Sequence, residues 1–156
     1  MNITLREITS ETVAQVIDLS VRPDQQQFVA PNATSLAEAL FSEEAWYRAV
    51  YDDETLVGFV MLYDETLRAV PPEKPNIGLW RLMIDQRFQK RGIGREVVRQ
   101  LIEHVRQKQG VNSFFTSYVP EIAGPESFYL SLGFVPNGEV EDGEIIVVYP
   151  LYKNAV

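Results

Sequence analysis

The chain has 156 residues, of which 46% are hydrophobic and 23% are charged, and this composition is typical of a globular domain with a full core. The formal net charge is −8, cysteine is absent and histidine occurs once, so disulfides, thiolate chemistry and histidine-based metal sites are excluded. The sequence contains no apolar run of about 18 residues and starts without a basic-then-apolar leader. We therefore expect one cytoplasmic domain over residues 1–156, with no membrane partner.

The first third of the chain predicts one strand and two helices. Apolar and polar residues alternate at the start, which is typical of a strand, and residues that can cap a helix precede two patterns of helical periodicity. A polar segment with two prolines separates the helices and predicts a loop or a broken helix. The predicted elements are a strand over 2–8, a helix from Ser10 to about Val21, a loop over 22–34, and a helix over 36–44 capped by Thr34 or Ser35.

Three strands follow. Residues 46–51 and 55–63 flank a polar turn, and the second of these runs is almost continuously apolar, as in a strand buried on both faces. Within it, Gly58 predicts a close approach of neighbouring backbone. A proline-rich loop then leads to a strand over residues 77–85.

A glycine-containing loop follows the strand that ends at Asp85, and it opens the most regular helical pattern of the chain. Apolar residues recur every four positions from Ile93 to Val105, and Gly110 ends the helix. The N–H groups and the positive end of the dipole at such a helix N-terminus favour a phosphate, and glycines allow backbone to come close to a ligand. Four basic residues surround this point: Arg87, Lys90, Arg91 and Arg95. The residue types predict a pyrophosphate cradle.

The spacing of the glycines narrows the kind of cradle. Neither Gly-x-Gly-x-x-Gly, the dinucleotide fingerprint, nor the Gly-Lys-Ser/Thr of a P-loop is present. The pattern is Gln89-x-x-Gly92-x-Gly94 after a strand, which resembles the acetyl-CoA loop of the GNAT family of N-acetyltransferases. Taken alone, a Gly-x-Gly at a strand–helix junction is equally consistent with plain turn chemistry.

The last third of the chain adds a second signature. Residues 114–119 predict a strand, and 125–132 predict a short helix with Pro125 at its first position and Gly133 as a left-handed cap. Strands over 134–140 and 144–149 flank Asp142-Gly143, a hairpin signal. The string from Phe128 to Phe134, Phe-Tyr-x-x-Leu-Gly-Phe, resembles the second GNAT signature.

The element order is β-α-α-β-β-β-α-β-α-β-β. It predicts an α/β fold with a mixed, mostly antiparallel sheet flanked by helices and one parallel crossover around the Gly92 helix. The GNAT family has this order, so the resemblance extends over essentially the whole chain. Residues 134–140 and 142–144 look closest to bacterial polyamine or diamine acetyltransferases.

The resemblance implies roles for particular residues. Acetyl-CoA would be the acetyl donor, and an amine would attack it directly without an acyl-enzyme. Tyr129 would protonate the departing thiolate; the alternative is a core tyrosine whose hydroxyl is tied to backbone. The residues implied in cofactor binding are Leu82, Met83 and Ile84 for the pantetheine arm, and Gln89, Lys90, Arg91, Gly92, Ile93, Gly94 and Arg95 for the pyrophosphate.

The sequence also departs from the family pattern. Trp80 and Arg81 stand where some relatives carry a carboxylate that acts as general base, so a water relay to a more distant group is the working hypothesis. Ile122 stands where many relatives have asparagine. His104 lies on the polar side of its helix, which indicates a solvated surface residue. In the family the early helix–loop–helix segment covers the acceptor site; its candidate lining residues, which fit core packing or a solvated face equally well, are Phe28, Asn32, Phe41 and Glu44.

The charge distribution bears on the substrate. Between Arg81 and Lys108 there are eight basic residues and three acidic ones, whereas the rest of the chain has six basic and nineteen acidic. A basic island in an acidic body fits an anionic cofactor and a cationic substrate, and it argues against nucleic acid. Acidity that merely keeps the protein soluble would explain the same numbers.

Three functional hypotheses remain open: acetylation of a polyamine or other small amine, acetylation of a protein amine or an aminoglycoside-like drug, and a non-catalytic acyl-CoA-binding regulator. Because GNAT proteins often dimerise, a homodimer is a further expectation. No metal is expected.

Overall fold

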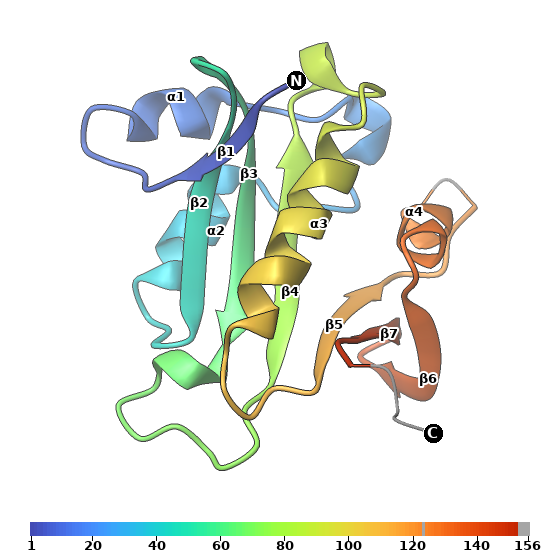
Figure 1. The fold of residues 1–156 in the computed structure, drawn as a ribbon. Coiled ribbons are helices and arrows are strands. Elements are labelled where there is room, and N and C mark those ends of the chain that lie inside the picture. The colour runs from blue at the N-terminus through green and yellow to red at the C-terminus, as the bar shows by residue number, and fades with distance from the viewer. Residues whose placement is uncertain (123, 153–156) are drawn as a thin grey trace.

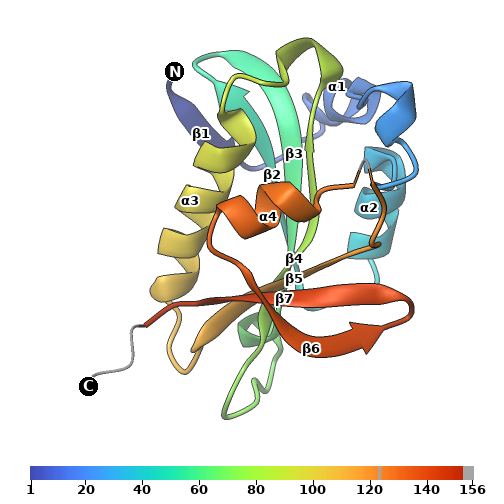
Figure 2. The same ribbon diagram turned by 90° about the vertical axis from the view of Figure 1, so that its right-hand side faces the viewer.

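The computed structural model of the protein describes residues 1–122 and 124–152, so Ala123 and the last four residues of the predicted 1–156 domain lie outside the described residues. Its centre is a seven-stranded sheet with the strand order β1-β2-β3-β4-β5-β7-β6. Neighbouring strands are antiparallel except β4 and β5, which are parallel and are joined through α3. Helices α1 and α2 cover one face, and α3 and α4 lie on the other (Figures 1 and 2). None of the helices in the described ranges is long and apolar enough to cross a bilayer.

The observed elements confirm the predicted order. The strands are β1 (Ile3–Arg6), β2 (Ala45–Asp52), β3 (Thr55–Asp64), β4 (Ile77–Ile84), β5 (Ser113–Tyr118), β6 (Val135–Glu141) and β7 (Glu144–Pro150). The helices are α1 (Val13–Asp18), α2 (Asn32–Ala39), α3 (Ile93–Arg106) and α4 (Glu126–Ser131). Short 3-10 turns occur at η1 (Pro23–Gln25), η2 (Glu65–Leu67) and η3 (Gln86–Phe88).

Two hydrophobic clusters hold the layers together. Strand β3 supplies both of them, because its alternate residues point to opposite faces of the sheet. Val60 and Leu62 pack toward α3 and α4, whereas Phe59 and Met61 pack toward α1 and α2. The prediction that β3 is buried on both faces is therefore confirmed.

The first two helices begin at other residues than the sequence predicted. Helix α1 follows Thr12 rather than Ser10, and α2 starts directly after Pro31, so that Thr34 and Ser35 lie inside it instead of capping it. A proline has no N–H to leave unsatisfied and its φ suits a helix start, so Pro31 was the stronger signal. The predicted cap of α4 is confirmed, because Gly133 has a φ of +106°.

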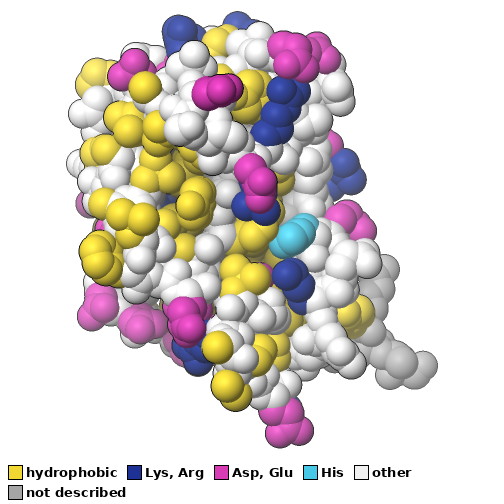
Figure 3. Space-filling model, turned by 90° about the vertical axis from the view of Figure 1, so that its left-hand side faces the viewer, with side chains coloured by type: hydrophobic (Ala, Val, Ile, Leu, Met, Phe, Trp, Pro, Cys, Tyr) yellow, Lys and Arg dark blue, Asp and Glu magenta, His cyan; other side chains and the backbone are white. Residues whose placement is uncertain are grey.

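His104 is not the solvated residue that its position on α3 suggested. Its ring packs against Trp46 of β2 with a centroid separation of 4.7 Å, and its Nε2 is buried without a hydrogen-bond partner. Burial lowers the pKa of His104, and the nearby Lys108 lowers it further. Figure 3 shows the histidine, half-buried, between basic and acidic side chains. Strand β2 passes under this end of α3, which the helical pattern alone could not reveal.

Strands β4 and β5 separate soon after they meet. They pair only at Ile77 with Phe114 and at Gly78 with Phe115, and β5 then turns away from β4 to join the β6–β7 hairpin (Figure 1). Across the other edge of β4, the register with β3 shifts between Met61 and Leu62, opposite Trp80. The divergence opens the centre of the sheet.

Candidate functional site

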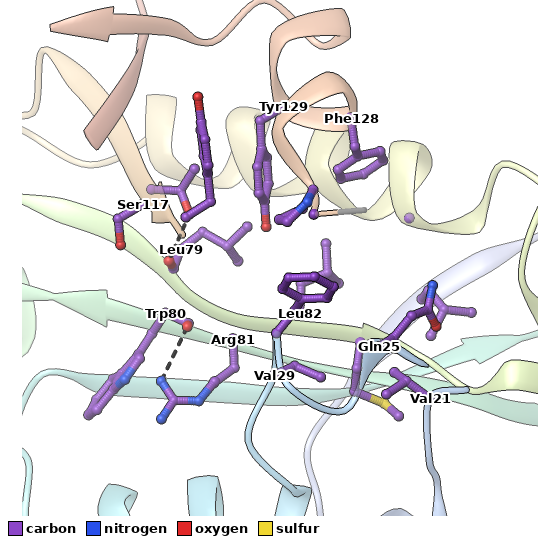
Figure 4. A pocket seen from close by; sticks show the side chains of 18 of the residues that line it. Val21, Gln25, Val29, Leu79, Trp80, Arg81, Leu82, Ser117, Phe128 and Tyr129 are labelled. Atoms are coloured by element: carbon purple, nitrogen blue, oxygen red, sulfur yellow. Dashed lines mark hydrogen bonds between the residues drawn. The ribbon is translucent and has the colours of Figure 1, made fainter. Parts of the chain in front are cut away.

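A cleft of about 1230 Å³ occupies the space where β4 and β5 diverge. Its walls come from β4, the N-terminus of α3, β5, α4, the segment over residues 21–31, and the β6–β7 hairpin. Figure 4 shows Tyr129 and Phe128 entering it from α4, with Leu79 and Leu82 of β4 on the opposite side. One continuous cavity thus lies between the two parts of the sheet.

The loop before α3 has the backbone conformation of an anion-binding turn. Gly92 is the N-cap residue of α3 with a φ of +83°, and Lys90 has a φ of +63°. The N-cap makes no side-chain hydrogen bond, so N–H groups of the first helical turn are left for a ligand. Lys90 and Arg95 line the same end of the cleft. Backbone donors, helix dipole and two cations together favour a phosphate group.

Two polar side chains fix this loop against the rest of the molecule. The amide Nε2 of Gln89 donates to the carbonyl of Ile84 at 2.9 Å and to Oε1 of Gln25 at 2.9 Å. The buried carboxylate of Asp85 accepts from the N–H of Ser20 and from the N–H and Nε of Arg87, at 2.8–3.0 Å. The cradle is therefore connected to the end of β4 and to the N-terminal segment.

The hydrogen bonds decide the charge state of Asp85. Burial alone would raise the pKa of this carboxyl, but bonds from Arg87 and from the N–H of Ser20 outweigh it, and the pKa lies below its usual value. Asp85 is thus ionised at neutral pH and provides a fixed negative charge behind the loop.

The glycines of the site have different functions. A Cβ added at Gly58 would lie 2.5 Å from the carbonyl oxygen of Met83, which confirms the predicted close backbone approach. At Gly94 a Cβ would lie 3.4 Å from the ring of Phe128, an ordinary contact. At Gly92 there is open space, and the positive φ is what requires glycine.

The edge of β4 that faces the cleft is free over most of its length. Beyond Gly78 it makes no ladder pair with β5 in the described residues, and Leu82, Met83 and Ile84 line the cavity. A strand edge offers N–H and C=O groups at regular spacing to any extended chain. The residues present therefore fit an extended, amide-containing arm that leads from the phosphate cradle.

Tyr129 lies on the opposite wall and is 9% exposed. Aromatic rings surround it: Tyr118 stacks at 6.5 Å, and Phe128 and Phe134 contact it edge-on at 5.3 and 5.7 Å. Its hydroxyl points from α4 toward β4 (Figure 4). Burial raises the pKa of Tyr129 to about 12, against a smaller opposing effect of the Thr116 hydroxyl. The phenol is a protonated donor across the physiological pH range.

The structure brings most of the predicted site residues together. Of those implied in cofactor binding, the cleft is lined by Leu82, Met83, Ile84, Gln89, Lys90, Gly92, Ile93, Gly94 and Arg95. Arg91 is not part of the lining: its exposed guanidinium donates to the carbonyl of Arg87 at 3.3 Å.

The residues that were candidates for lining the acceptor site lie in different places. Phe28 lines the cleft, but Asn32 is buried against α1, where it donates to the carbonyl of Val16 at 2.8 Å. Glu44 forms an ion pair with Arg68 at 2.8 Å, and Phe41 is 91% exposed beyond the end of α2. Of the four candidates, only Phe28 is therefore among the residues that line the cleft.

Sequence reasoning missed the acidic wall of the cleft. Glu141, Asp142 and Glu144 line it from the β6–β7 hairpin. The Asp-Gly turn had been recognised as a hairpin signal, and its two acidic neighbours were the available hint. Arg81 also lines the cleft, and its guanidinium is paired with Glu38 of α2 at 3.3 Å.

The chain matches a family profile, a protein of assigned function and solved structures. Residues 14–134 match the profile of the Acetyltransferase (GNAT) family. A spermine/spermidine N(1)-acetyltransferase of Bacillus subtilis is 28% identical over 161 residues, which span 97% of this chain and 100% of that protein.

Many solved structures share the fold, among them two at low sequence identity. An aminoglycoside acetyltransferase in complex with coenzyme A superposes with a TM-score of 0.74 at 18% identity, covering 96% of this chain and 95% of that one. An N-acetyltransferase of Thermoplasma acidophilum, also with coenzyme A, gives a TM-score of 0.68 at 17% identity, covering 96% and 99%.

Proposed function

The chain belongs to the GNAT family of acetyltransferases, and from that premise we propose that it transfers the acetyl group of acetyl-CoA to a primary amine of a small polycation, such as spermidine or spermine. The observation that carries the proposal is the charge of the cleft, which has Lys90 and Arg95 at the cradle and the carboxylates of the hairpin on another wall. Opposite charges on different walls suit an anionic donor and a cationic acceptor that bind side by side.

The curated relative supports the acceptor class. Its name specifies spermine and spermidine, and the alignment spans 97% of this chain. An aminoglycoside is also a polyamine, so the second hypothesis shares this chemistry. A polyamine is the simpler acceptor for the acidic hairpin, because its ammonium groups are spaced along a flexible chain with few other polar contacts to satisfy.

We assign the cofactor contacts by chemistry. Backbone N–H groups from Gly92 to Arg95 would hold the pyrophosphate, with Lys90 and Arg95 adding charge. The free edge of β4 at Leu82–Ile84 would bind the pantetheine arm like an added strand. When bound, acetyl-CoA supplies an activated acetyl thioester.

The side chains of the protein would orient the reactants and transfer protons. The attacking amine must be neutral, since an ammonium with a pKa of about 10 has no lone pair. Holding the amine and the acyl carbon within about 3.5 Å supplies much of the rate. The phenol of Tyr129, which is protonated and buried, would then donate to the sulfur as charge develops there. The amine proton would leave through water; the carboxylates among the described lining residues are Glu141, Asp142 and Glu144.

A free-thiol release assay with acetyl-CoA and a panel of amines tests this function. The panel contains spermidine, spermine, short diamines, monoamines, an aminoglycoside and peptides, and we expect the highest kcat/KM for polyamines. A preference for peptides or for the aminoglycoside would contradict the proposed acceptor. Coenzyme A binding without turnover on any amine would instead favour a non-catalytic acyl-CoA-binding regulator.

Tyr129→Phe tests the proposed catalytic residue. Removing a general acid costs about 10²–10⁴ in rate, whereas the affinity for coenzyme A, measured by calorimetry, should change little. Tyr152→Phe is the matched control, because Tyr152 is 55% exposed and lies outside the cleft. A Tyr129→Phe enzyme with the wild-type rate would rule out the acid function.

A further inference from the structure

The point where β4 and β5 part is closed by one buried side chain. Beyond the last ladder pair of Gly78 with Phe115, the hydroxyl of Thr116 donates to the carbonyl of Leu79 at 3.2 Å. Thr116 is 3% exposed. A side-chain hydrogen bond thus continues the link between the two strands for one more step, and the cleft opens from there.

Thr116 also belongs to the surface that carries Tyr129. Residues 114, 116 and 118 of β5 share one face of the strand. Tyr118 stacks on Tyr129 with an interplanar angle of 17°, and Phe114 contacts Phe134, which in turn contacts Tyr129. A shift of β5 relative to β4 would therefore move the phenol with it.

The same link bounds the cavity at its inner end. Leu79, Thr116 and Phe115 all line the cleft, and the ring of Phe115 covers Gly78 so closely that an added Cβ would lie 2.4 Å from it. Any chain lying between the strands and pointing away from the cradle ends against these residues. The distance from Tyr129 to this floor limits the length of the group that fits there.

We propose that Thr116 is a positioning residue, which holds Tyr129 at a fixed separation from β4 and thereby restricts the acyl chain to a short one. This inference rests on the proposed function, because it takes the thioester to lie beside Tyr129. Without the Thr116 link, no hydrogen bond in the described residues joins β4 and β5 beyond the ladder pair of Gly78 with Phe115, and the floor of the cleft is held by side-chain packing alone.

Substitutions at Thr116 separate the hydrogen bond from the shape. Thr116→Val keeps the volume but removes the donor, and Thr116→Ser keeps the donor but removes the methyl group. Ser113→Ala is the control, since Ser113 lies on the same strand, is exposed and is outside the cleft. The readouts are kcat and KM for acetyl-CoA with spermidine, and the ratio of kcat/KM for butyryl-CoA to that for acetyl-CoA.

We expect Thr116→Val to lower kcat about ten- to hundredfold with little change in KM, as loss of alignment does. The butyryl-to-acetyl ratio should rise by about tenfold, the effect of roughly one hydrogen bond. Thr116→Ser and Ser113→Ala should keep the wild-type ratio. An unchanged ratio in Thr116→Val, or a Thr116→Ser enzyme as impaired as Thr116→Val, would overturn the proposal.

The positioning role of Thr116 can be tested even if the proposed acetyltransferase function is wrong. If the wild-type protein turns over no amine, calorimetry gives the ratio of the affinities for butyryl-CoA and acetyl-CoA, which replaces the ratio of kcat/KM as the readout. A rise of that ratio in Thr116→Val supports the positioning role, and an unchanged ratio refutes it. Circular dichroism checks the fold, and Thr116→Ala, which also lacks the donor, replaces Thr116→Val if the valine variant does not fold.

Discussion

The two glycines of the cradle should respond to alanine in different ways, although their motif makes them look equivalent. Gly92 has a φ of +83° with no atom near an added Cβ, so alanine there is strained but not blocked. A non-glycine residue in the left-handed region costs about 1–2 kcal/mol. Gly94 lies in the first turn of α3, and its Cβ would rest 3.4 Å from the ring of Phe128. Alanine there removes backbone freedom from the unfolded chain at almost no steric cost.

The expected magnitudes follow from these environments. For a domain of this size 1 kcal/mol corresponds to a Tm shift of about 2–4 °C, so Gly92→Ala should lower Tm by roughly 2–8 °C. Gly94→Ala should leave Tm unchanged or raise it by about 1–3 °C. Coenzyme A affinity should fall clearly in Gly92→Ala, because the loop must change its φ, but by less than about threefold in Gly94→Ala.

Thermal unfolding with and without coenzyme A, together with calorimetry, measures both effects on the same samples. Each variant is its partner's control, because both add a single methyl group at the N-terminal end of α3. A wild-type Tm for Gly92→Ala would show that its φ is not a constraint. A loss of coenzyme A affinity above tenfold in a stable Gly94→Ala protein would show that this Cβ faces the ligand rather than Phe128.

Three further expectations concern charge. The value of kcat/KM for an amine should rise about tenfold per pH unit between pH 7 and 9, because the reactive amine has a pKa near 10. Since the pKa of Tyr129 is about 12, a falling alkaline limb below pH 10 would contradict its role as acid. Asp85→Asn should destabilise the protein in urea by about 1.5–3 kcal/mol at pH 7. The pKa of Asp85 is lowered in the folded state, so the carboxylate stabilises the protein above its unfolded pKa of about 4, and this stabilisation is lost as the pH falls through the folded pKa. Equal free energies of unfolding for the wild type and Asp85→Asn at pH 7 would show that the hydrogen bonds of Asp85 do not stabilise the fold. Replacing Glu141, Asp142 and Glu144 by their amides should raise KM more for spermine than for a monoamine, and equal changes for both would argue against charge recognition.

The fold and the glycine loop before α3 were predictable because their signals are local. Helix α3 shows a complete apolar stripe, all of which is buried from Ile93 to Val105, and the chain places Gly92 directly before it. The hairpin at Asp142-Gly143 was equally local: both residues have positive φ, as its turn type requires. Features of this kind depend on neighbours within a few residues.

The cleft walls outside the glycine loop were predicted poorly, because they are assembled from segments that are distant in the chain. Asn32, the first residue of α2, donates to the carbonyl of Val16 in α1, whereas Phe28 lines the cleft. The burial of His104 depends on Trp46, which is 58 positions away in the sequence. Neither contact produces a periodic pattern in the sequence. The sequence could therefore indicate which segment lies near the cleft, but not which of its side chains enter the cleft.

The divergence of β4 and β5 links the stability of the fold to its function. Separating the strands leaves backbone groups of β4 without ladder partners, and an unpaired group that is removed from water costs about 1–3 kcal/mol. In this structure the hydroxyl of Thr116 occupies the carbonyl of Leu79 and the amide of Gln89 occupies the carbonyl of Ile84, and between these two points β4 has no ladder partner on the cleft side in the described residues. A ligand that pairs with this edge restores the missing bonds, so binding energy arises from the same groups that the fold left unpaired. Thr116 therefore stands at the boundary between the paired and the unpaired parts of β4.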